Sequence, residues 1–414
     1  MLGFIGFCRI LFPKSRINIK TLKGVDTMKF SKRMEAFSSG IFAELNKKKK
    51  ELEENGIPTI DLSVGSPDRP PAPHIIETLR KEVENLNNYV YAINDTRELR
   101  EAAKNWYLRR FGVELDPETE IMSLIGSQDG LAHICLSIID PGDVVLVPDP
   151  GYPIFSAGPL IAGAELAYMP VLEENDFLIK FEDIDEETAK KAKLLIVSYP
   201  SNPVAATAPG EFYQQLVDFA KNYDIAVLHD NAYCELTFDG YRAGSFLQTP
   251  GAKDIGVEFN SLSKTYNMAG CRIGFALGNK DIIANLSKLK SQCDYGIFLP
   301  IQKAGVAALE GPQHCVRENA LMYQRRRDVL VDGLKEAGWN IRKPKATMFV
   351  WAAIPEKYSS SMEFTFDLME KTGVMVTPGV SFGPRGEGFV RIALVQPEEK
   401  IKEAVDRIKQ SGIF

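Results

Sequence analysis

Short apolar runs alternate with helix-length amphipathic segments through the middle of the chain, and this pattern restricts its fold more than any other feature. The runs VVLVP (residues 144–148), LLIVSYP (194–200) and IAVLHD (225–230) have the length of buried strands. Between the last two lies PGEFYQQLVDFAKNYD, a helical pattern that opens with proline and an acidic residue. Continuous apolar strands separated by helices indicate a mainly parallel sheet covered on both faces. We therefore expect an α/β fold.

The chain changes character from about Pro312 onward. A long helical stretch, QHCVRENALMYQRRRDVLVDGLKEAG, is followed by MFVWAAIP, a second helix, and the runs VMVTPG and FVRIALV. This arrangement indicates a smaller α+β domain. We expect a large domain over residues 61–305 and a small domain over 306–414. Residues 28–60 form an amino-terminal segment whose helix, near residues 42–55, is expected to pack with the small domain.

The first residues, MLGFIGFCRILFPKSRINIK, need a separate interpretation. Their apolar run is broken by Arg9 and ends at Pro13, so it is too short to span a bilayer, and no small-residue cleavage site follows. The segment is basic and poor in acidic residues, which leaves a transit peptide as an alternative. Because the sequence after Met28 has the pattern of a natural amino terminus, we interpret residues 1–27 as an upstream extension. No other stretch is apolar for 18 residues, so no transmembrane helix is expected.

Composition and charge argue against several classes of partner and cofactor. The formal net charge is −6 and no long basic stripe stands out, which argues against nucleic acid or an anionic membrane as a partner. The six cysteines are scattered without a C-x-x-C pair, and the chain has only four histidines. We therefore expect neither a metal site nor a disulfide framework, and a reducing compartment, the cytoplasm, as the location.

One candidate anion site lies at the start of a predicted helix. In GSQDGLAHICLSIID, a Gly-Ser turn at Ser127 opens an amphipathic pattern. The free N–H groups and the dipole of such a helix start bind anions, although glycine and serine suit an ordinary helix start equally well. No G-x-G-x-x-G follows a first strand and no G-x-x-x-x-G-K-[ST] occurs, so neither a dinucleotide nor a P-loop nucleotide is indicated.

Two charged residues stand beside buried strands. Asp230 ends the apolar run IAVLHD, where an unpaired carboxylate is costly, so it either caps a helix or holds a cationic nitrogen of a ligand. Tyr233 follows three residues later. Lys264 lies between IGVEF and CRIGFALG, and burial there would lower its pKa and free its amine as a nucleophile. A lysine that extends to the surface is the alternative.

Other residues near these two have both a structural and a functional interpretation. Ser261 and Ser263 form a turn or donate hydroxyl hydrogen bonds to a ligand. The planar fork of Arg272 suits a phosphate. Arg391, in GFVRIALV, faces solvent from an edge strand or binds an anion. Tyr152, in DPGYPIF, fills the core or stacks on a flat ligand.

Together these residues supply an amine, a carboxylate, a phosphate cradle and an arginine for a substrate carboxylate, as a pyridoxal phosphate site requires. The chain resembles the fold type I, pyridoxal-phosphate-dependent aminotransferases of the aspartate aminotransferase superfamily. SLSKTYNMAGCRIG resembles the lysine signature of that superfamily, and SNP and DNAY resemble two of its other motifs. The resemblance covers nearly the whole chain from about Met28. SKTYNMAGCRIG, GSQDGLAHICLSIIDPGD and DPGYPIF are most similar to LL-diaminopimelate aminotransferases.

The resemblance implies a seven-stranded sheet in the large domain and a role for each cofactor ligand. Lys264 is expected to form the Schiff base and to act as general base, and Asp230 to hold the pyridine nitrogen. Asn202 and Tyr233 are expected to bind the phenolic oxygen, and Tyr152 to stack on the ring. The phosphate is expected to be held by a group of polar residues around the helix start: Ser127, Gln128, Ser261, Ser263 and Arg272.

The resemblance also assigns the substrate contacts and a partner. Arg391 matches the arginine that binds the substrate α-carboxylate, and Gly65 matches the glycine that closes over the substrate. Asn202 is expected to contact the substrate as well as the cofactor. Tyr91, in NYVYAIND, matches a tyrosine that reaches the phosphate in the neighbouring subunit, so a homodimer is expected. Two departures bear on the substrate. The usual N-P-T-G reads N-P-V-A, ending in Val204 and Ala205, and Cys271 replaces a frequent tryptophan.

These expectations favour an aminotransferase that acts on an amino acid and a 2-oxo acid, with LL-diaminopimelate and 2-oxoglutarate as the pair and lysine biosynthesis as the pathway. An aspartate or alanine aminotransferase is the first alternative. A β-lyase or a decarboxylase is the next, because the same lysine and aspartate serve those reactions. A ligand sensor without catalytic activity is a further alternative, but residues 1–27 are too short for an attached helix-turn-helix domain.

Overall fold

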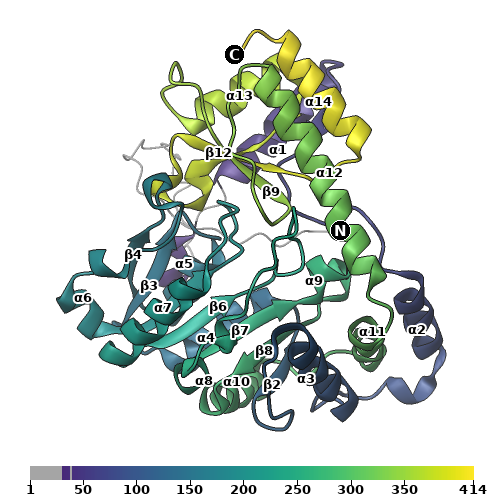
Figure 1. The fold of residues 1–414 in the computed structure, drawn as a ribbon, viewed down its shortest axis with the longest axis vertical. Coiled ribbons are helices and arrows are strands. Elements are labelled where there is room, and N and C mark those ends of the chain that lie inside the picture. Colours follow the sequence, from purple (N-terminus) through teal and green to yellow (C-terminus); the bar gives the residue numbers. More distant parts are fainter. Residues whose placement is uncertain (1–29, 38–39) are drawn as a thin grey trace, which may run out of the picture.

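The centre of the molecule is a seven-stranded sheet with strand order β2-β8-β7-β6-β5-β3-β4 (Figure 1). The computed structural model describes residues 30–37 and 40–414, so the predicted extension, residues 1–27, lies outside the described residues. The strands are β2 (Ile121–Leu124), β3 (Val144–Asp149), β4 (Glu165–Pro170), β5 (Ala192–Ser198), β6 (Ala226–Asp230), β7 (Gly256–Ser261) and β8 (Gly274–Gly278). All neighbours are parallel except β8, which is antiparallel to β2 and β7. The predicted α/β class and mainly parallel sheet are confirmed.

Strand β5 shows why the central positions of this sheet are mostly apolar. Leu194 and Ile196 belong to the hydrophobic cluster on one face of the sheet, and Leu195 and Val197 to the cluster on the other. Successive side chains of a strand point to opposite faces, so most central positions of a strand covered on both faces are apolar.

Two sets of helices provide that cover. Helices α3 (Arg97–Phe111), α7 (Gly210–Tyr223) and α11 (Leu299–Glu310) contribute to the cluster that contains Leu195 and Val197. Helices α4 (Ser127–Ile138), α5 (Ile154–Ala162) and α10 (Lys280–Cys293) contribute to the cluster that contains Leu194 and Ile196. The remaining helices of this part are α2 (Pro73–Glu84), α6 (Glu186–Lys191), α8 (Ala252–Ile255) and α9 (Leu262–Thr265). Short 3-10 helices are η1 (Lys32–Ala36), η2 (Leu86–Asn88), η3 (Glu173–Asn175), η4 (Phe181–Asp183), η5 (Phe246–Gln248), η6 (Ala269–Cys271), η7 (Gly379–Phe382) and η8 (Pro384–Gly386).

The carboxy-terminal section has a separate core and lies above the large sheet in Figure 1. Its three-stranded antiparallel sheet has the order β11-β12-β9, formed by β9 (Phe349–Ala353), β11 (Thr377–Pro378) and β12 (Phe389–Ala393). Helices α12 (His314–Glu336), α13 (Ser361–Thr372) and α14 (Glu398–Gln410) surround it.

The amino-terminal segment joins this section. The short strands β1 (Ile60–Asp61) and β10 (Val374–Met375) pair in parallel, and α1 (Gly40–Glu54) packs on α13 through Leu45, Leu52 and Met369. The exact domain boundaries remain a prediction.

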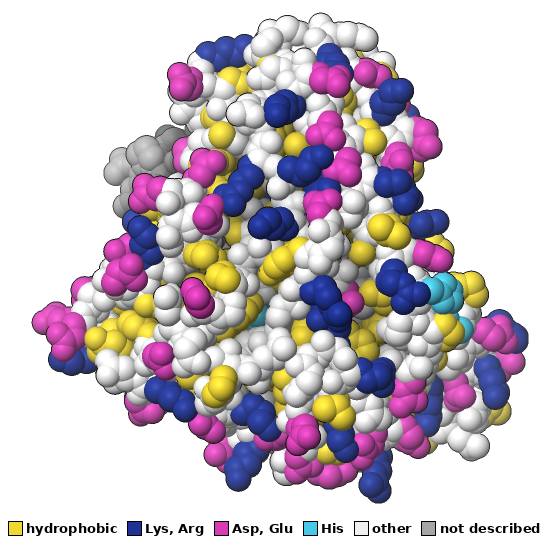
Figure 2. Space-filling model, in the orientation of Figure 1, with side chains coloured by type: hydrophobic (Ala, Val, Ile, Leu, Met, Phe, Trp, Pro, Cys, Tyr) yellow, Lys and Arg dark blue, Asp and Glu magenta, His cyan; other side chains and the backbone are white. Residues whose placement is uncertain are grey.

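Charges of both signs are interspersed over the face of the molecule drawn in Figure 2. None of the helices in the described part of the chain combines the length and the apolar character needed to cross a bilayer.

Gly158 marks a close helix contact that is open to test. A Cβ on this residue of α5 would lie 2.7 Å from the carbonyl oxygen of Leu131 in α4. Because a backbone atom cannot move aside unless α4 shifts, we expect Gly158→Ala to destabilise the protein by about 1–3 kcal/mol in chemical unfolding. Gly210→Ala is the matched control, since a Cβ at the first residue of α7 meets nothing within 4 Å. Equal losses of stability in the two variants would contradict this packing.

Candidate active site

The predicted site residues meet in a cavity of about 400 Å³ at the carboxyl edge of the large sheet. Asp230 ends β6, Asn202 follows β5, Tyr152 follows β3, and Lys264 in α9 follows β7. Parallel strands end at one edge, so residues distant in sequence come together there. The cavity is lined by all the predicted site residues except Tyr91, namely Gly65, Ser127, Gln128, Tyr152, Asn202, Asp230, Tyr233, Ser261, Ser263, Lys264, Arg272 and Arg391.

Tyr91 does not line this cavity. Its side chain is exposed, and its ring centroid lies 5.2 Å from that of Tyr295. Tyr91 therefore does not contact the phosphate site of its own chain, and its predicted role depends on a neighbouring subunit.

The amine of Lys264 is positioned by a capped turn. The Ser261 hydroxyl accepts a hydrogen bond from the Ser263 amide at 3.2 Å, which caps α9 at the end of β7. The Nζ atom donates to the Gly65 carbonyl at 2.8 Å and lies 6.0 Å from the ring centroid of Tyr233. Burial, together with the charges of Arg391 and Arg272, lowers the pKa of Lys264 to about 8. At pH 7 about a tenth of this amine is therefore neutral and nucleophilic, far more than for an exposed lysine.

One end of the cavity is suited to a phosphate. Gly126 precedes α4 with φ of 76°, and Arg272 lies so close that a Cβ on Gly126 would come within 2.1 Å of its Nη2 atom. The guanidinium and the free amides of the first turn of α4 face the same space. Gln128 is held there by the hydroxyl of Tyr152, which donates to its Oε1 atom at 2.9 Å. A helix start and an arginine together form an anion site.

Asp230 is a buried carboxylate with an unused acceptor. Its Oδ1 atom has no hydrogen-bond partner among the described residues. Burial raises the pKa of Asp230 to about 6, while the nearby charges of His229 and Lys264 act in the opposite direction. A protonated ring nitrogen would satisfy this oxygen and stabilise its charge, so the residue fits the pyridine nitrogen of pyridoxal phosphate.

Arg391 is a buried cation without an acidic partner among the described residues. It donates to Asn202 Oδ1 at 2.8 Å and to the Ser63 carbonyl at 2.7 Å. Its guanidinium lies between two rings, 4.3 Å from the centroid of Phe349 and 4.6 Å from that of Phe382. Burial lowers the pKa of Arg391 to about 10. A carboxylate bound here would supply the missing counter-charge.

The charge balance of the cavity points to anionic ligands. Lys264, Arg272 and Arg391 line it, whereas Asp230 is its one carboxylate among the described residues. The cations lie at separate places: Arg272 at the start of α4, Lys264 beside Gly65, and Arg391 between two rings. This arrangement fits a phosphate beside Arg272, a carbonyl carbon within reach of the Lys264 amine, and a carboxylate beside Arg391.

Sequence reasoning missed Phe349 and Phe382. No sequence signal distinguishes an aromatic ring that borders a cavity from one that fills a core, and both residues lie in apolar surroundings. The structure also shows where the sequence departures predicted to affect the substrate lie. Val204, Ala205 and Cys271 are not lining residues of the cavity. Ala205 has a left-handed conformation, with φ of 56°, at the position where the family usually has glycine.

Comparisons with known proteins agree with this geometry. The family described as "Aminotransferase class I and II" matches residues 57–408. LL-diaminopimelate aminotransferase of Moorella thermoacetica is 46% identical over 92% of this chain and 98% of the relative. The enzyme of the same name from Halothermothrix orenii is 46% identical over 90% of this chain and 96% of the relative.

A solved structure shows the same fold. It is a probable N-succinyldiaminopimelate aminotransferase from Thermus thermophilus, which matches with a TM-score of 0.85 and 37% identity over 89% of this chain and 99% of that one. The chain belongs to the class I and II aminotransferases and is a pyridoxal-phosphate-dependent transaminase.

Proposed function

We propose that this aminotransferase transfers an amino group between LL-diaminopimelate and 2-oxoglutarate, and that it serves lysine biosynthesis in the cytoplasm. The observation that carries the reaction is the group of Lys264, Asp230 and Arg391 in one cavity, with an anion site at the start of α4. The substrate is supported by relatives named LL-diaminopimelate aminotransferase, which match nearly the full length of the chain. The cytoplasm is supported by the free state of all five described cysteines.

Different residues of the cavity bind different parts of the cofactor. We assign its ring nitrogen to Asp230, its phenolic oxygen to Asn202 and Tyr233, and one face of its ring to Tyr152. We assign the phosphate to five residues around the start of α4: Ser127, Gln128, Ser261, Ser263 and Arg272. When bound, pyridoxal phosphate withdraws electrons from the Cα atom of the amino acid and makes its proton acidic.

Lys264 and Arg391 act on the substrate. Arg391 binds its α-carboxylate, and the rings of Phe349 and Phe382 keep the guanidinium in place before the substrate arrives. Gly65 borders the same space and accepts a hydrogen bond from the amine of Lys264. Once free, that amine removes the Cα proton as general base, for which a pKa near 8 is well suited.

A homodimer is proposed from the surface around Tyr91. Leu86, Tyr89, Val90, Tyr91 and Ile93 are all more than half exposed, and Tyr295 and Phe298 pack beside them. A contiguous exposed apolar surface is typical of a protein interface. A second copy of this chain would cover the surface and bring Tyr91 to the phosphate of the neighbouring site.

Removing the amine of Lys264 tests the reaction. We expect Lys264→Ala to lose transaminase activity by more than about 10³-fold, because no other described amine lines the cavity. Cofactor binding should persist, since Asp230 and Arg272 remain. Lys290→Ala is a control, because Lys290 is paired with Asp129 and Asp294 outside the cavity. Full turnover by Lys264→Ala without added amine would contradict the role of Lys264.

A panel of single amino acids tests the substrate. Absorbance of the holoenzyme reports conversion of the cofactor to its amine form in each half-reaction. We expect LL-diaminopimelate to convert the cofactor faster than aspartate, glutamate, alanine or N-succinyldiaminopimelate. If one of the others converts it and LL-diaminopimelate does not, the substrate is wrong and the transaminase assignment stands. Release of pyruvate and ammonia without a 2-oxo acid would instead indicate a lyase.

A mixing experiment tests the shared site. Tyr91→Ala and Lys264→Ala dimers are purified separately, then mixed and allowed to exchange subunits. If Tyr91 serves the partner, one site of each hybrid has both Lys264 and Tyr91 intact, so activity should rise above that of either variant alone. No recovery despite subunit exchange, or full activity of a monomer in sedimentation, would contradict the proposal.

A further inference from the structure

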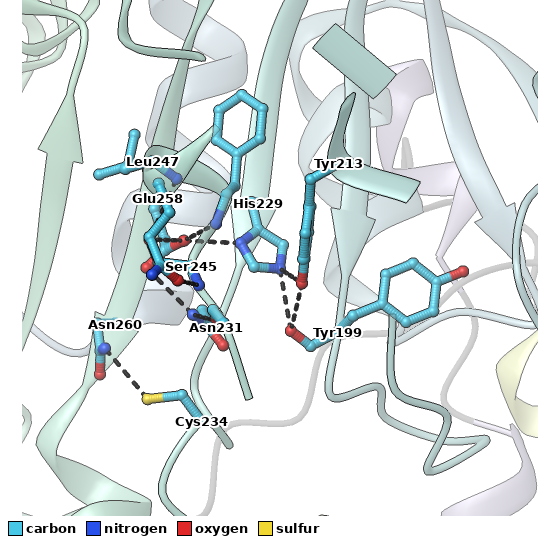
Figure 3. Close-up of polar contacts among 12 residues, drawn as sticks. Tyr199, Tyr213, His229, Asn231, Cys234, Ser245, Leu247, Glu258 and Asn260 are labelled. Carbon is cyan, nitrogen blue, oxygen red and sulfur yellow. Dashed lines mark hydrogen bonds and ion pairs between the residues drawn. The ribbon is translucent and has the colours of Figure 1, made fainter. Parts of the chain in front are cut away.

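A second polar group lies inside the large sheet, separate from the cavity but next to Asp230. His229 precedes Asp230 in β6, and its neighbour in register on β7 is Glu258. Both side chains are fully buried, with no exposed surface. In Figure 3 the imidazole of His229 lies between the Glu258 carboxylate on one side and Tyr199 and Tyr213 on the other. The reaction assigned above uses neither His229 nor Glu258.

The contacts of Glu258 show that it is ionised. Its Oε1 atom accepts from the Tyr107 hydroxyl at 2.8 Å and its Oε2 atom from the Ser245 hydroxyl at 2.8 Å. Each hydroxyl itself accepts another hydrogen bond, from Asn260 Nδ2 and the Leu247 amide respectively, so its own proton points to Glu258.

The remaining contacts of Glu258 are also donors. They are the Phe246 amide at 2.9 Å and Asn231 Nδ2 at 3.1 Å. Burial by itself would raise the pKa of Glu258, but these hydrogen bonds and that of His229 lower it below its usual value. A carboxyl group surrounded by donors carries no proton.

His229 has the opposite surroundings, because acceptors face both of its ring nitrogens. Nδ1 lies 2.9 Å from Glu258 Oε2, and Nε2 lies 3.0 Å from the carbonyl oxygen of Tyr199. Neither oxygen carries a proton, so each nitrogen must supply one. A neutral tautomer would place a nitrogen lone pair against the Tyr199 carbonyl, and the Tyr213 hydroxyl, 3.4 Å from Nε2, donates its proton to that same carbonyl at 3.3 Å.

We propose that His229 is a buried imidazolium, held by Glu258 and the Tyr199 carbonyl, and that it is a positioning residue that keeps Asp230 ionised for the cofactor. The role toward Asp230 rests on the proposed function, whereas the charge of His229 does not. His229 is adjacent to Asp230 on the same strand, and Glu258 lies one strand further away. The cation therefore acts on Asp230 more strongly than its counter-ion does, and it is the largest charge that lowers the pKa of Asp230.

No other described titratable group in contact with this pair changes charge near neutral pH. Tyr213 of α7 faces His229, and Tyr107 of α3 faces Glu258. Burial holds the pKa of both phenols well above its usual value, so both stay neutral. Tyr199 faces His229 only through its carbonyl, because its hydroxyl donates to Phe177 O.

The charge of His229 is tested by NMR of the wild-type holoenzyme. The chain has only four histidines, so ¹⁵N-histidine labelling yields few signals. At pH 8 we expect one imidazole with two slowly exchanging N–H protons, because acceptors face both ring nitrogens. That signal should vanish in His229→Gln/Glu258→Gln, which assigns it. A single ring proton on His229 in that spectrum would overturn the proposal.

The effect on Asp230 is tested by the acid limb of kcat/KM. Removing the cation raises the pKa of Asp230, so we expect the acid midpoint of His229→Gln to move up by about one pH unit, a tenfold change in ionisation. The isosteric double variant avoids an unpaired Glu258 and should shift the midpoint less, in the same direction. Tyr213→Phe keeps both acceptors of His229, Glu258 and the Tyr199 carbonyl, and should leave the acid midpoint of kcat/KM unchanged. An unshifted midpoint in a folded His229 variant would overturn the role.

Two separate measurements distinguish failure of the proposed function from failure of the inference about His229. If Asp230→Asn kept full activity, the assignment of Asp230 to the cofactor would fall, while the two ring protons of His229 would still be observed.

Discussion

Burial of the central strands on both faces is the constraint on which the rest of this structure depends. A strand covered by helices on each side has no tolerance for unpaired polar groups along its length, as the apolar positions of β5 show. Buried polar residues of the central strands therefore lie at the strand ends, where the cavity is, or in hydrogen-bonded sites within the sheet. Asp230 is of the first kind, and Glu258 with His229 is of the second.

The cavity combines unpaired charge with fixed geometry. Lys264, Arg272 and Arg391 have no ion-pair partner among the described residues. Each is oriented by neutral contacts: the Gly65 carbonyl for Lys264, the Ala269 carbonyl for Arg272, and two aromatic rings for Arg391. Because these cations are held in place before an anion binds, less conformational entropy is lost on binding. Burial lowers the pKa of the Lys264 amine most, and the two arginines lower it too because each disfavours the protonated form. The arginines that would bind anions therefore also contribute to the reactivity of the amine.

Much of the site was predictable because its residues sit at recognisable places in the sequence. Asn202, Asp230 and Lys264 each follow a visible apolar run, and strand ends converge in a parallel sheet. The rings of Phe349 and Phe382 were not predictable, because they belong to hydrophobic clusters in the same way as core residues. Val204 and Cys271 were expected to bear on the substrate because they are close in sequence to site residues. Neither side chain lines the cavity.

The sequence by itself determined the α/β class, the parallel sheet and the identity of the reactive groups, since these follow from local periodicity and from residue type. Only the tertiary structure decided which groups touch. Arg391 meets Asn202 across 189 positions of sequence, and His229 meets Glu258 because β6 and β7 pair in one register. Register and packing set which donor faces which acceptor, and those contacts fix charge states that no local pattern contains.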